Sequence, residues 1–308
     1  METLELDGRR TLITGASSGI GRALAQAMAR KGARLVLVAR RRERLEQLAE
    51  EIESEGGRRP SVVVADLSVR GQAQAAAQGV LAELDGIDIL VNNAGGAVGG
   101  STWAVADGDE ARADFEVDFW SPMALIGAIV PGMRRRGHGT VVNVTSIRQI
   151  LAWPSFGHNA AAQAALAMTT ETLRLELEPY GVNVVEVIPG PIETPVQGPT
   201  SLMPGIVDAI HGRLGTATPE DLAERIVDAT VEHRDRVFCP EESGRRMYEN
   251  PVEARAQVAA DARRVLAELP RNEMIDTLVI GAEHPVVLAA REQWEREHSG
   301  AEAGSERR

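Results

Sequence analysis

Residues 10 to 21 read RTLITGASSGIG, a short apolar run followed directly by a glycine-rich turn. The run is typical of a buried β-strand, and the residues after the turn have the pattern of a helix. Gly15 permits a tight turn, Gly19 lets the backbone approach a pyrophosphate, and Gly21 allows close packing of the helix. Because a helix N-terminus offers unpaired N–H groups, the turn predicts a phosphate site; a glycine-rich turn without a ligand is the alternative.

The unit of strand, turn and helix recurs along the chain. Its apolar runs are nearly continuous in Val, Ile and Leu, which is typical of parallel strands buried on both faces of a sheet. The predicted strands are residues 10–14, 34–39, 61–65, 87–91, 140–145 and 182–188, and a helix is predicted over about 156–178. The alternation predicts an α/β fold with a Rossmann-type, doubly wound parallel sheet in a single domain.

The alternation loosens after residue 189. A proline- and glycine-rich stretch to residue 205 predicts a mobile loop, and a capped helix is predicted from Thr218. Two more helical segments are predicted near residues 251–269 and 285–297. The expected organisation is a Rossmann domain over residues 1–240, a helical C-terminal extension over 241–298, and a disordered tail over 299–308.

The composition of the chain excludes several classes of protein. A formal net charge of -12 over 308 residues repels nucleic acid on average. The single cysteine, Cys239, cannot form an internal disulfide, which fits a reducing compartment. The sequence has no apolar stretch suited to a signal peptide or a membrane span. We therefore expect a cytoplasmic protein that has neither nucleic acid nor a membrane as a partner and that binds no metal.

Polar and basic residues follow the next strands at their carboxyl ends. Arg40 stands at the end of the second strand, where an arginine would bind the 2′-phosphate of a dinucleotide and a carboxylate would bind the ribose hydroxyls. This favours NADP(H) over NAD(H), and a solvated helix start is the alternative. Asp66 and Leu67 follow the third strand, and the stretch NNAG at 92–95 follows the fourth. Ligands of open α/β sheets bind at these strand ends.

The stretches TGASSGIG, NNAG and PGPIET (residues 189–194), in this order and spacing, resemble the short-chain dehydrogenase/reductase family over about residues 5–240. The resemblance implies oxidoreductase activity, a nicotinamide cofactor and assembly as a homodimer or homotetramer. The cofactor residues that it implies, together with Arg40, are Gly15, Ser17, Ser18, Ile20, Gly21, Asp66, Leu67, Asn93, Ala94, Gly95, Pro189, Gly190, Ile192 and Thr194.

The catalytic residues of that family are matched at one position of four. The family uses a serine, a Tyr-x-x-x-Lys pair that supplies a proton, and an asparagine. Ser146 matches the serine, whereas Asn159 stands at the tyrosine, Gln163 at the lysine and Asp118 at the asparagine. An amide has no proton to give at neutral pH, and a neutral side chain does not stabilise a phenolate. The chemistry of this chain is therefore expected to be atypical.

Other residues of the chain do not replace the missing pair in an obvious way. The single lysine, Lys31, is expected far from the strand ends, and neither Tyr180 nor Tyr248 falls near the cleft. His158 is adjacent to the tyrosine position and would titrate near neutrality, so it is a candidate proton donor; an ordinary surface or core imidazole is the alternative. Arg148 would line the cleft, as would Asp118, but an ion pair or a solvated charge is the preferred interpretation of each.

Aromatic residues on segments near the cleft predict an apolar substrate pocket, and core packing is the alternative. The aromatic candidates are Trp103, Trp120, Trp153 and Phe156, and they would line the pocket together with Leu202 and Met203 of the predicted mobile loop. Two functions are consistent with these features. The first is an NADP(H)-dependent ketoreductase or dehydrogenase that acts on a hydrophobic carbonyl or alcohol, such as an aromatic polycycle. The second is a non-redox protein of the same fold: a scaffold, a cofactor-binding pseudoenzyme, or an enzyme of another reaction such as a cyclisation.

Overall fold

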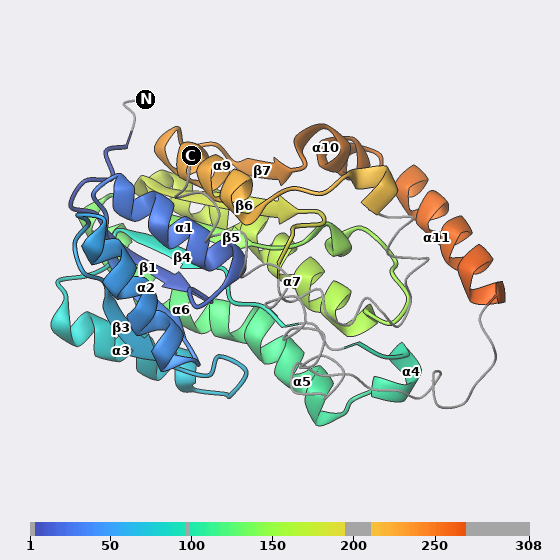
Figure 1. Cartoon of the computed structure of the whole chain (residues 1–308), viewed down its shortest axis with the longest axis horizontal. Helices are drawn as coiled ribbons and strands as arrows, with labels where there is room; N and C mark the ends of the chain where they lie inside the picture. Colours follow the sequence, from blue (N-terminus) through green and yellow to red (C-terminus); the bar gives the residue numbers. More distant parts are fainter. Residues whose placement is uncertain (1–3, 97–98, 195–210, 269–308) are drawn as a thin grey trace, which may run out of the picture.

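The computed structural model describes residues 4–96, 99–194 and 211–268 (Figure 1). Within these residues, seven parallel strands form one sheet in the order β3-β2-β1-β4-β5-β6-β7. The strands are β1 (Arg10–Thr14), β2 (Arg34–Ala39), β3 (Ser61–Val64), β4 (Ile89–Asn92), β5 (Gly139–Val144), β6 (Val182–Pro189) and β7 (Arg236–Cys239). The order reverses between β1 and β4, and in sheets of this kind ligands bind at the carboxyl ends of the strands on either side of such a switch point.

Helices cover both faces of the sheet. They are α1 (Gly19–Arg30), α2 (Arg42–Ser54), α3 (Gln72–Glu83), α4 (Thr102–Val105), α5 (Asp109–Phe115), α6 (Ser121–Arg136), α7 (Gly157–Leu177), α9 (Pro219–Val231), α10 (Glu241–Glu249) and α11 (Pro251–Glu268). Short π and 3-10 turns are η1 (Glu116–Trp120), η2 (Ile147–Gln149) and η3 (Glu178–Tyr180). The buried residues place α1, α2 and α9 on one face, and α3, α6 and α7 on the other.

The structure confirms the predicted doubly wound fold and each of the six predicted strands, with shifts of one or two residues at their ends. The predicted capped helix is also confirmed. Thr218 Oγ1 accepts a hydrogen bond from Asp221 N at 3.1 Å, and the Asp221 carboxylate accepts one from Thr218 N at 3.4 Å. The sequence analysis missed β7. This strand has four residues, and such a short apolar run bounded by charges and a proline has little periodicity to detect.

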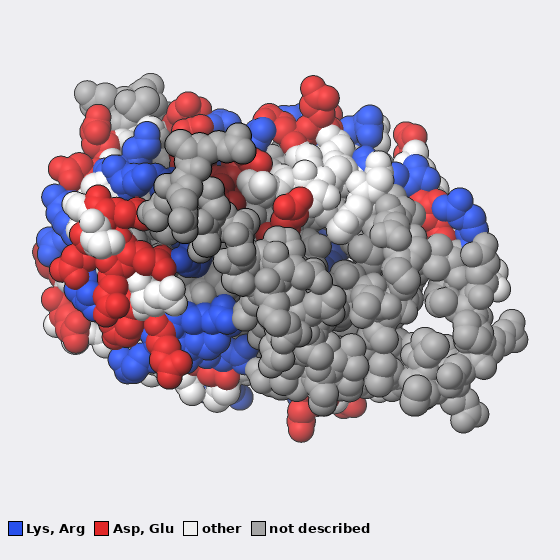
Figure 2. All heavy atoms as spheres, viewed as in Figure 1, with Lys and Arg blue, Asp and Glu red and all other residues white. Residues whose placement is uncertain are grey.

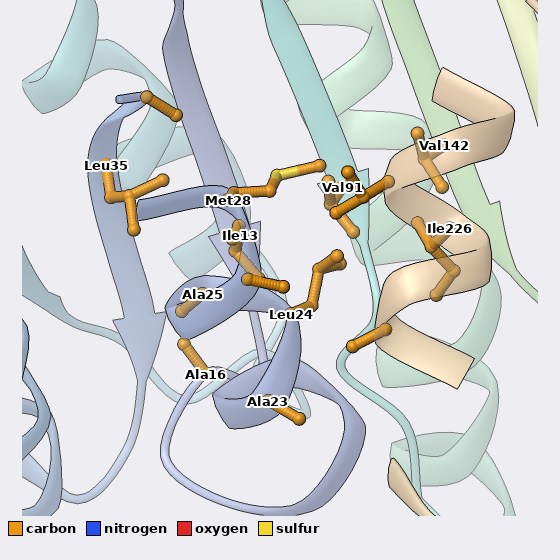
Figure 3. Close-up of a cluster of buried hydrophobic side chains, with 14 of the residues drawn as sticks. Ile13, Ala16, Ala23, Leu24, Ala25, Met28, Leu35, Val91, Val142 and Ile226 are labelled. Atoms are coloured by element: carbon orange, nitrogen blue, oxygen red, sulfur yellow. The ribbon is translucent and has the colours of Figure 1, made fainter. Parts of the chain in front are cut away.

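One core cluster joins α1 and α9 to the middle of the sheet. Leu24 and Met28 of α1 point toward Ile13 and Val91 on the strands, and Ile226 of α9 closes the cluster (Figure 3). All five side chains are fully buried. Burial of this kind contributes about 1.5–3 kcal/mol for each large apolar side chain, so the cluster holds the first crossover helix firmly against the strand that precedes it.

The C-terminal helices pack beside the loop that follows β5. Met247 of α10 and Val258 of α11 share a buried cluster with Ile147 and Leu151 of that loop. In addition, Arg255 Nε donates a hydrogen bond to the backbone oxygen of Ile150 at 2.7 Å. The described part of the predicted extension therefore supports a loop at the carboxyl edge of the sheet. The predicted helix near 285–297 and the predicted tail at 299–308 lie outside the described residues.

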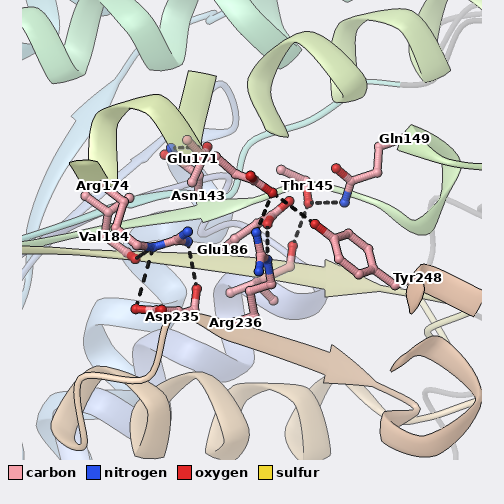
Figure 4. Close-up of polar contacts among 12 residues, drawn as sticks. Asn143, Thr145, Gln149, Glu171, Arg174, Val184, Glu186, Asp235, Arg236 and Tyr248 are labelled. Atoms are coloured by element: carbon pink, nitrogen blue, oxygen red, sulfur yellow. Dashed lines mark hydrogen bonds and ion pairs between the residues drawn. The ribbon is translucent and has the colours of Figure 1, made fainter. Parts of the chain in front are cut away.

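A polar cluster ties four elements together near this edge (Figure 4). Glu186 of β6 is fully buried and accepts a hydrogen bond from Arg236 Nε of β7 at 3.0 Å. Arg236 also pairs with Glu171 of α7, which accepts a hydrogen bond from the Tyr248 hydroxyl of α10 at 3.0 Å. Burial raises the pKa of Glu186 above its usual value, and burial is also the main cause that raises the pKa of Tyr248 to about 12. Tyr248 therefore serves this cluster as a hydrogen-bond donor.

Charged side chains cover much of the described surface. Figure 2 shows acidic and basic residues intermixed on the face that α1 and α2 form. Some of them join the two helices directly, as Arg22 of α1 and Glu51 of α2 do at 2.5 Å. Among the described residues, none of the helices combines the length and the apolar character that crossing a membrane requires.

The central strands should be sensitive to loss of packing. Val142 of β5 is fully buried, whereas Val252 of α11 is 79% exposed. We expect Val142→Ala to lower the free energy of unfolding by about 2–3 kcal/mol, because two buried methyl groups are lost and a cavity remains. The matched control Val252→Ala should change it by less than about 0.5 kcal/mol. Denaturant unfolding followed by circular dichroism measures both, and equal losses would contradict this account of the core.

Candidate active site

The glycine-rich turn lies between β1 and α1, and it leaves no room for a side chain at Gly15 or at Gly21. A Cβ on Gly15 would lie 2.9 Å from Ala94 Cα and from Asn93 Nδ2, and Gly15 has a φ of +68°. A Cβ on Gly21 would lie 2.5 Å from the Gly15 backbone oxygen and from Asn93 Nδ2. Only glycine therefore fits at these two positions, and the backbone itself forms the wall of the crevice.

Two other loops meet this turn. Thr14 Oγ1 accepts hydrogen bonds from the backbone N–H groups of Asn93 and Ala94 at 2.9 and 3.0 Å. The Asn93 side chain donates to the Thr14 backbone oxygen at 2.9 Å. On the other side, a Cβ on Gly19 would lie 3.1 Å from Thr194 Cγ2 of the PGPIET stretch. The three stretches on which the family resemblance rests are thus brought together around the N-terminus of α1.

The basic residues after β2 lie at the far end of the same turn. Arg41 Nη2 donates hydrogen bonds to the hydroxyls of Ser17 and Ser18, both at 2.9 Å. Arg40 instead forms an ion pair with Asp66 at 3.8 Å. The sequence analysis selected Arg40 from a run of three arginines, and it could not tell which of them reaches the turn because that depends on the start of α2. Arg41 is therefore a further candidate for binding phosphate.

The remaining predicted cofactor residues lie at strand ends or in the first helix. Leu67 is buried, and its backbone oxygen accepts a hydrogen bond from the Ser121 hydroxyl at 2.8 Å. Gly190 N donates to the Cys239 backbone oxygen at 2.7 Å, and Ile192 forms a bridge with Ala217. Gly95 lies in the loop after β4, where a Cβ would lie 3.1 Å from Asp118 Oδ1. Ile20 of α1 packs against the core, and Pro189 pairs with Cys239 of β7 at the end of β6.

A closed polar network occupies the place where the family resemblance predicts the tyrosine. Asn159, in the first turn of α7, is 1% exposed. Its Nδ2 donates to Asp118 Oδ2 at 2.7 Å and to the Gly96 backbone oxygen at 2.9 Å, and its Oδ1 accepts from Arg148 Nη1 at 2.7 Å. Asp118 Oδ1 in turn accepts from Gly96 N at 3.0 Å. The Asn159 amide is therefore held in one orientation.

Burial shifts the pKa values of the two ionisable groups in this network, Asp118 and Arg148. Burial is the main cause that raises the pKa of Asp118 well above its usual range, and the nearby carboxylate of Asp114 raises it further. Desolvation lowers the pKa of Arg148, against the opposing influence of Asp118 and Asp114. Arginine starts from so high a pKa that this guanidinium remains charged at neutral pH.

Arg148 is enclosed on two further sides. Its backbone N–H donates to Ser146 Oγ at 3.2 Å, which places the two residues side by side at the carboxyl end of β5. Its guanidinium carbon lies 4.6 Å from the ring centroid of Phe156 and 5.6 Å from that of Trp153, within the range of cation–π interactions. The two rings meet edge to face at 6.0 Å. The sequence analysis did not select Arg148 as a site residue, because no spacing rule connects it with Asn159.

The preferred interpretation of Asp118 and Arg148 as ion-paired or solvated charges was wrong for Asp118. Its side chain is 1% exposed and accepts its side-chain hydrogen bond from an amide rather than from a cation. Arg148 keeps some accessible surface, but among the described residues no carboxylate lies within ion-pair distance of it.

Gln163 lies one helical turn beyond Asn159 in α7, at the position of the family's lysine. It is 7% exposed, and its Oε1 is buried without a hydrogen-bond partner among the described residues. Leaving such an acceptor unpaired costs about 1–3 kcal/mol. The side chain is therefore suited to accept a hydrogen bond from a ligand in the crevice, and it fits a dinucleotide that carries ribose hydroxyls.

His158 lies apart from this network. Its Nε2 is 2.5 Å from the backbone oxygen of Ala106. It lines a cavity of about 970 Å³ together with Phe115 and Trp120, and the lining of that cavity includes neither Ser146 nor the residues of the Asn159 network. The sequence neighbour of Asn159 thus points to a different side of α7, because adjacent residues of a helix face about 100° apart.

The predicted aromatic wall is divided between two places. Trp153 and the buried Phe156 lie together beside Arg148. Trp103 and Trp120 are 68% and 56% exposed, and Trp120 lines the cavity beside His158. Leu202 and Met203 lie outside the described residues.

The residues that would have to replace the family's pair are engaged elsewhere. Lys31 caps the C-terminus of α1, and Tyr180 lies beneath the guanidinium of Arg134 at 3.9 Å. Tyr248 belongs to the cluster with Glu171. Within the described part of the chain, no tyrosine or lysine therefore joins the Asn159 network.

The fold and the crevice define a doubly wound dinucleotide-binding protein. A model of the short chain dehydrogenase family matches residues 9–204. An uncharacterized oxidoreductase of Mycobacterium tuberculosis strain H37Rv is 35% identical over 236 residues, which are 76% of this chain and 67% of that protein. The chain therefore belongs to the short-chain dehydrogenase family.

Solved structures agree with this assignment. The L-sorbose reductase of Gluconobacter frateurii, complexed with NADPH and L-sorbose, has a TM-score of 0.68 at 28% identity, and the match covers 76% of this chain and 97% of that one. A short-chain dehydrogenase of Burkholderia phymatum, complexed with NAD, has a TM-score of 0.69 at 26% identity, with 80% and 93% covered. The chain is thus an oxidoreductase of the short-chain type, and its structural neighbours bind nicotinamide cofactors.

The glycine-rich turn can be tested by adding a single methyl group. Gly21→Ala should lower the free energy of unfolding by about 1–3 kcal/mol and weaken NADPH binding, because its Cβ would meet the Gly15 backbone. The matched control is Gly79→Ala on the exposed side of α3, where nothing lies within 4 Å. It should stabilise the fold by about 1 kcal/mol through helix propensity. Denaturant unfolding and titration calorimetry measure the effects; a harmless Gly21→Ala would refute the close approach.

Proposed function

We propose that this protein is an atypical NADP(H)-dependent short-chain oxidoreductase that acts on a hydrophobic carbonyl or alcohol without the usual tyrosine and lysine. One observation carries the proposal. The glycine-rich turn keeps the close backbone approach that a dinucleotide needs, while the tyrosine position holds Asn159 inside a closed network. When bound, the nicotinamide would supply or accept a hydride.

Four groups of this chain are suited to hold the cofactor. The N-terminus of α1 would face the pyrophosphate, since the first turn of a helix carries unpaired N–H groups. Arg40 and Arg41 would face the 2′-phosphate of the adenosine ribose, which supports a preference for NADP(H). The unpaired Oε1 of Gln163 would accept a hydrogen bond from a ribose hydroxyl.

In this chain, the group that would orient the substrate is different from the source of the proton. Ser146 lies at the carboxyl end of β5 and would donate its hydroxyl hydrogen to a substrate oxygen. Asn159 cannot deliver a proton, and His158 lies at the other cavity, so the structure lends little support to His158 as proton donor. We infer that the proton comes from solvent or from the substrate itself.

A second function is favoured by the same network. Because both N–H groups of the Asn159 amide are bonded within the protein, the catalytic position is stabilised by internal contacts rather than left open for chemistry. A cofactor-binding protein without redox activity, or an enzyme of another reaction, would have this property. The two functions differ in whether the purified protein oxidises NADPH in the presence of carbonyl compounds.

We also propose that the protein is a homo-oligomer. Met168 and Leu175 of α7 are 67% and 72% exposed, and they lie on the same face of the helix because they are seven residues apart. A second copy of the chain would bury this apolar stripe. The solution mass from light scattering decides whether the protein is monomeric.

Cofactor preference is tested by binding. Titration calorimetry should give a Kd for NADPH at least about tenfold below that for NADH, because a charge-assisted hydrogen bond contributes roughly 1.5–3 kcal/mol. The double variant Arg40→Ala with Arg41→Ala should remove most of this difference. Arg42→Ala is the control, since Arg42 is 65% exposed and pairs with Glu46 on its own helix. Equal affinities for both cofactors would contradict the NADP(H) preference, and no binding of either would contradict the proposed function.

Restoring the family's pair tests the cleft. Asn159→Tyr with Gln163→Lys should raise the rate of NADPH oxidation with aromatic ketones by about 10²–10⁴-fold, the usual contribution of a positioned proton donor. Asn159→Phe with Gln163→Lys is the control, because it lacks the hydroxyl. A lack of gain would mean that the cleft no longer accepts this chemistry. No NADPH oxidation by the natural chain across a panel of carbonyl compounds would favour the second function.

A further inference from the structure

Arg148 is held as a fixed cation at the carboxyl edge of the sheet. Its backbone is anchored to Ser146 Oγ, and its guanidinium is oriented by the oxygen of Asn159 at 2.7 Å. Phe156 lies under the guanidinium at 4.6 Å. A charged side chain with this many constraints loses little conformational freedom when it binds a partner, so it is preorganised for recognition.

The guanidinium has binding capacity that the described residues do not use. An arginine side chain carries five N–H donors, and one of them is bonded, to Asn159. Two other partly buried arginines of the described chain are paired with carboxylates: Arg10 binds Asp88 at 2.7 Å, and Arg236 binds Glu186 at 3.0 Å. Among the described residues, Arg148 has no such pair.

The neighbouring carboxyl groups do not fully balance the positive charge of Arg148. Asp118 and Asp114 are the carboxyl groups whose charges act on it. Burial and the neighbouring Asp114 carboxylate raise the pKa of Asp118, which weakens the ability of this acid to balance the Arg148 charge. Asn159 separates the Asp118 carboxyl from the guanidinium and binds both. A planar anion would therefore find an attractive field on the side of Arg148 that keeps accessible surface.

We infer that Arg148 is the binding group for a carboxylate of the substrate. The guanidinium would bind the two carboxylate oxygens through parallel N–H donors. Phe156 and Trp153 would contact the apolar part of the same molecule, and Ser146 would lie beside its carbonyl or hydroxyl oxygen. The substrate class is a hydrophobic oxo acid or hydroxy acid. This inference rests on the proposed function for the identity of the cleft, but the binding itself requires no cofactor.

The test compares an acid with its neutral ester. Benzoylformate and methyl benzoylformate differ in the charge of one group, and their binding is measured by titration calorimetry and by quenching of tryptophan fluorescence, both without cofactor and with saturating NADPH. The natural chain should bind benzoylformate at least about tenfold more tightly than the ester, in line with a charge-assisted pair. Inorganic phosphate should compete weakly, because it has no apolar part to contact the rings.

Substitutions at Arg148 locate the effect. Arg148→Gln should bind the acid and the ester equally, while Arg148→Lys should keep part of the preference, because it retains the charge but loses the paired donors. Arg42→Gln is the matched control on the surface and should bind like the natural chain. Thermal unfolding checks that each variant is folded. If Arg148→Gln does not fold, the comparison of acid and ester on the natural chain and on Arg148→Lys decides the question.

The outcomes separate this inference from the proposed function. The inference is overturned if the natural chain shows no preference for the acid, or if folded Arg148→Gln keeps that preference. NADPH binding is measured separately on the same samples. A preference for the acid without any NADPH binding would uphold the carboxylate site and reject the proposed function, and NADPH binding without the preference would do the reverse.

Discussion

The crevice between β1 and β4 depends on a direct contact between two loops at which side chains are excluded. A methyl group on Gly21 would lie 2.5 Å from the Gly15 backbone, and the Asn93 side chain occupies the space that remains. Thr14 accepts two hydrogen bonds from Asn93 and a third from the Ala94 backbone N–H, and these bonds join the loops after both strands. This contact sets the position of the α1 N-terminus relative to the loop after β4, and ligands of such sheets bind at these strand ends.

The neighbouring network shows what becomes of a catalytic position when its chemistry changes. An amide at 159 offers donors and an acceptor, and it uses them to join Asp118 to Arg148. Proton transfer is lost, since an amide does not ionise at neutral pH. In exchange, a guanidinium is held next to Ser146 and two aromatic rings. The site therefore presents a fixed positive charge where the family resemblance predicts a proton donor.

Much of the fold could be predicted from the sequence, because strands and helices follow local periodicity and glycine positions. The predictions failed where the answer depended on distant packing. The four residues of β7 carry too little pattern to detect, yet they complete the sheet because β6 is already there to pair with them. A run of arginines gave no sign that Arg41 would reach Ser17 and Ser18. The role of His158 stays a prediction, although it faces a cavity away from Ser146.

The sequence by itself determined the doubly wound fold and the glycine-rich turn, since both follow from patterns in consecutive residues. The tertiary structure alone decided that Asp118, Arg148 and Asn159 form one network. These residues come from three separate elements, and the distances between their side chains follow from how η1, η2 and α7 pack at the carboxyl edge of the sheet. No local pattern contains that information, because burial and electrostatic pairing arise only when the elements are assembled.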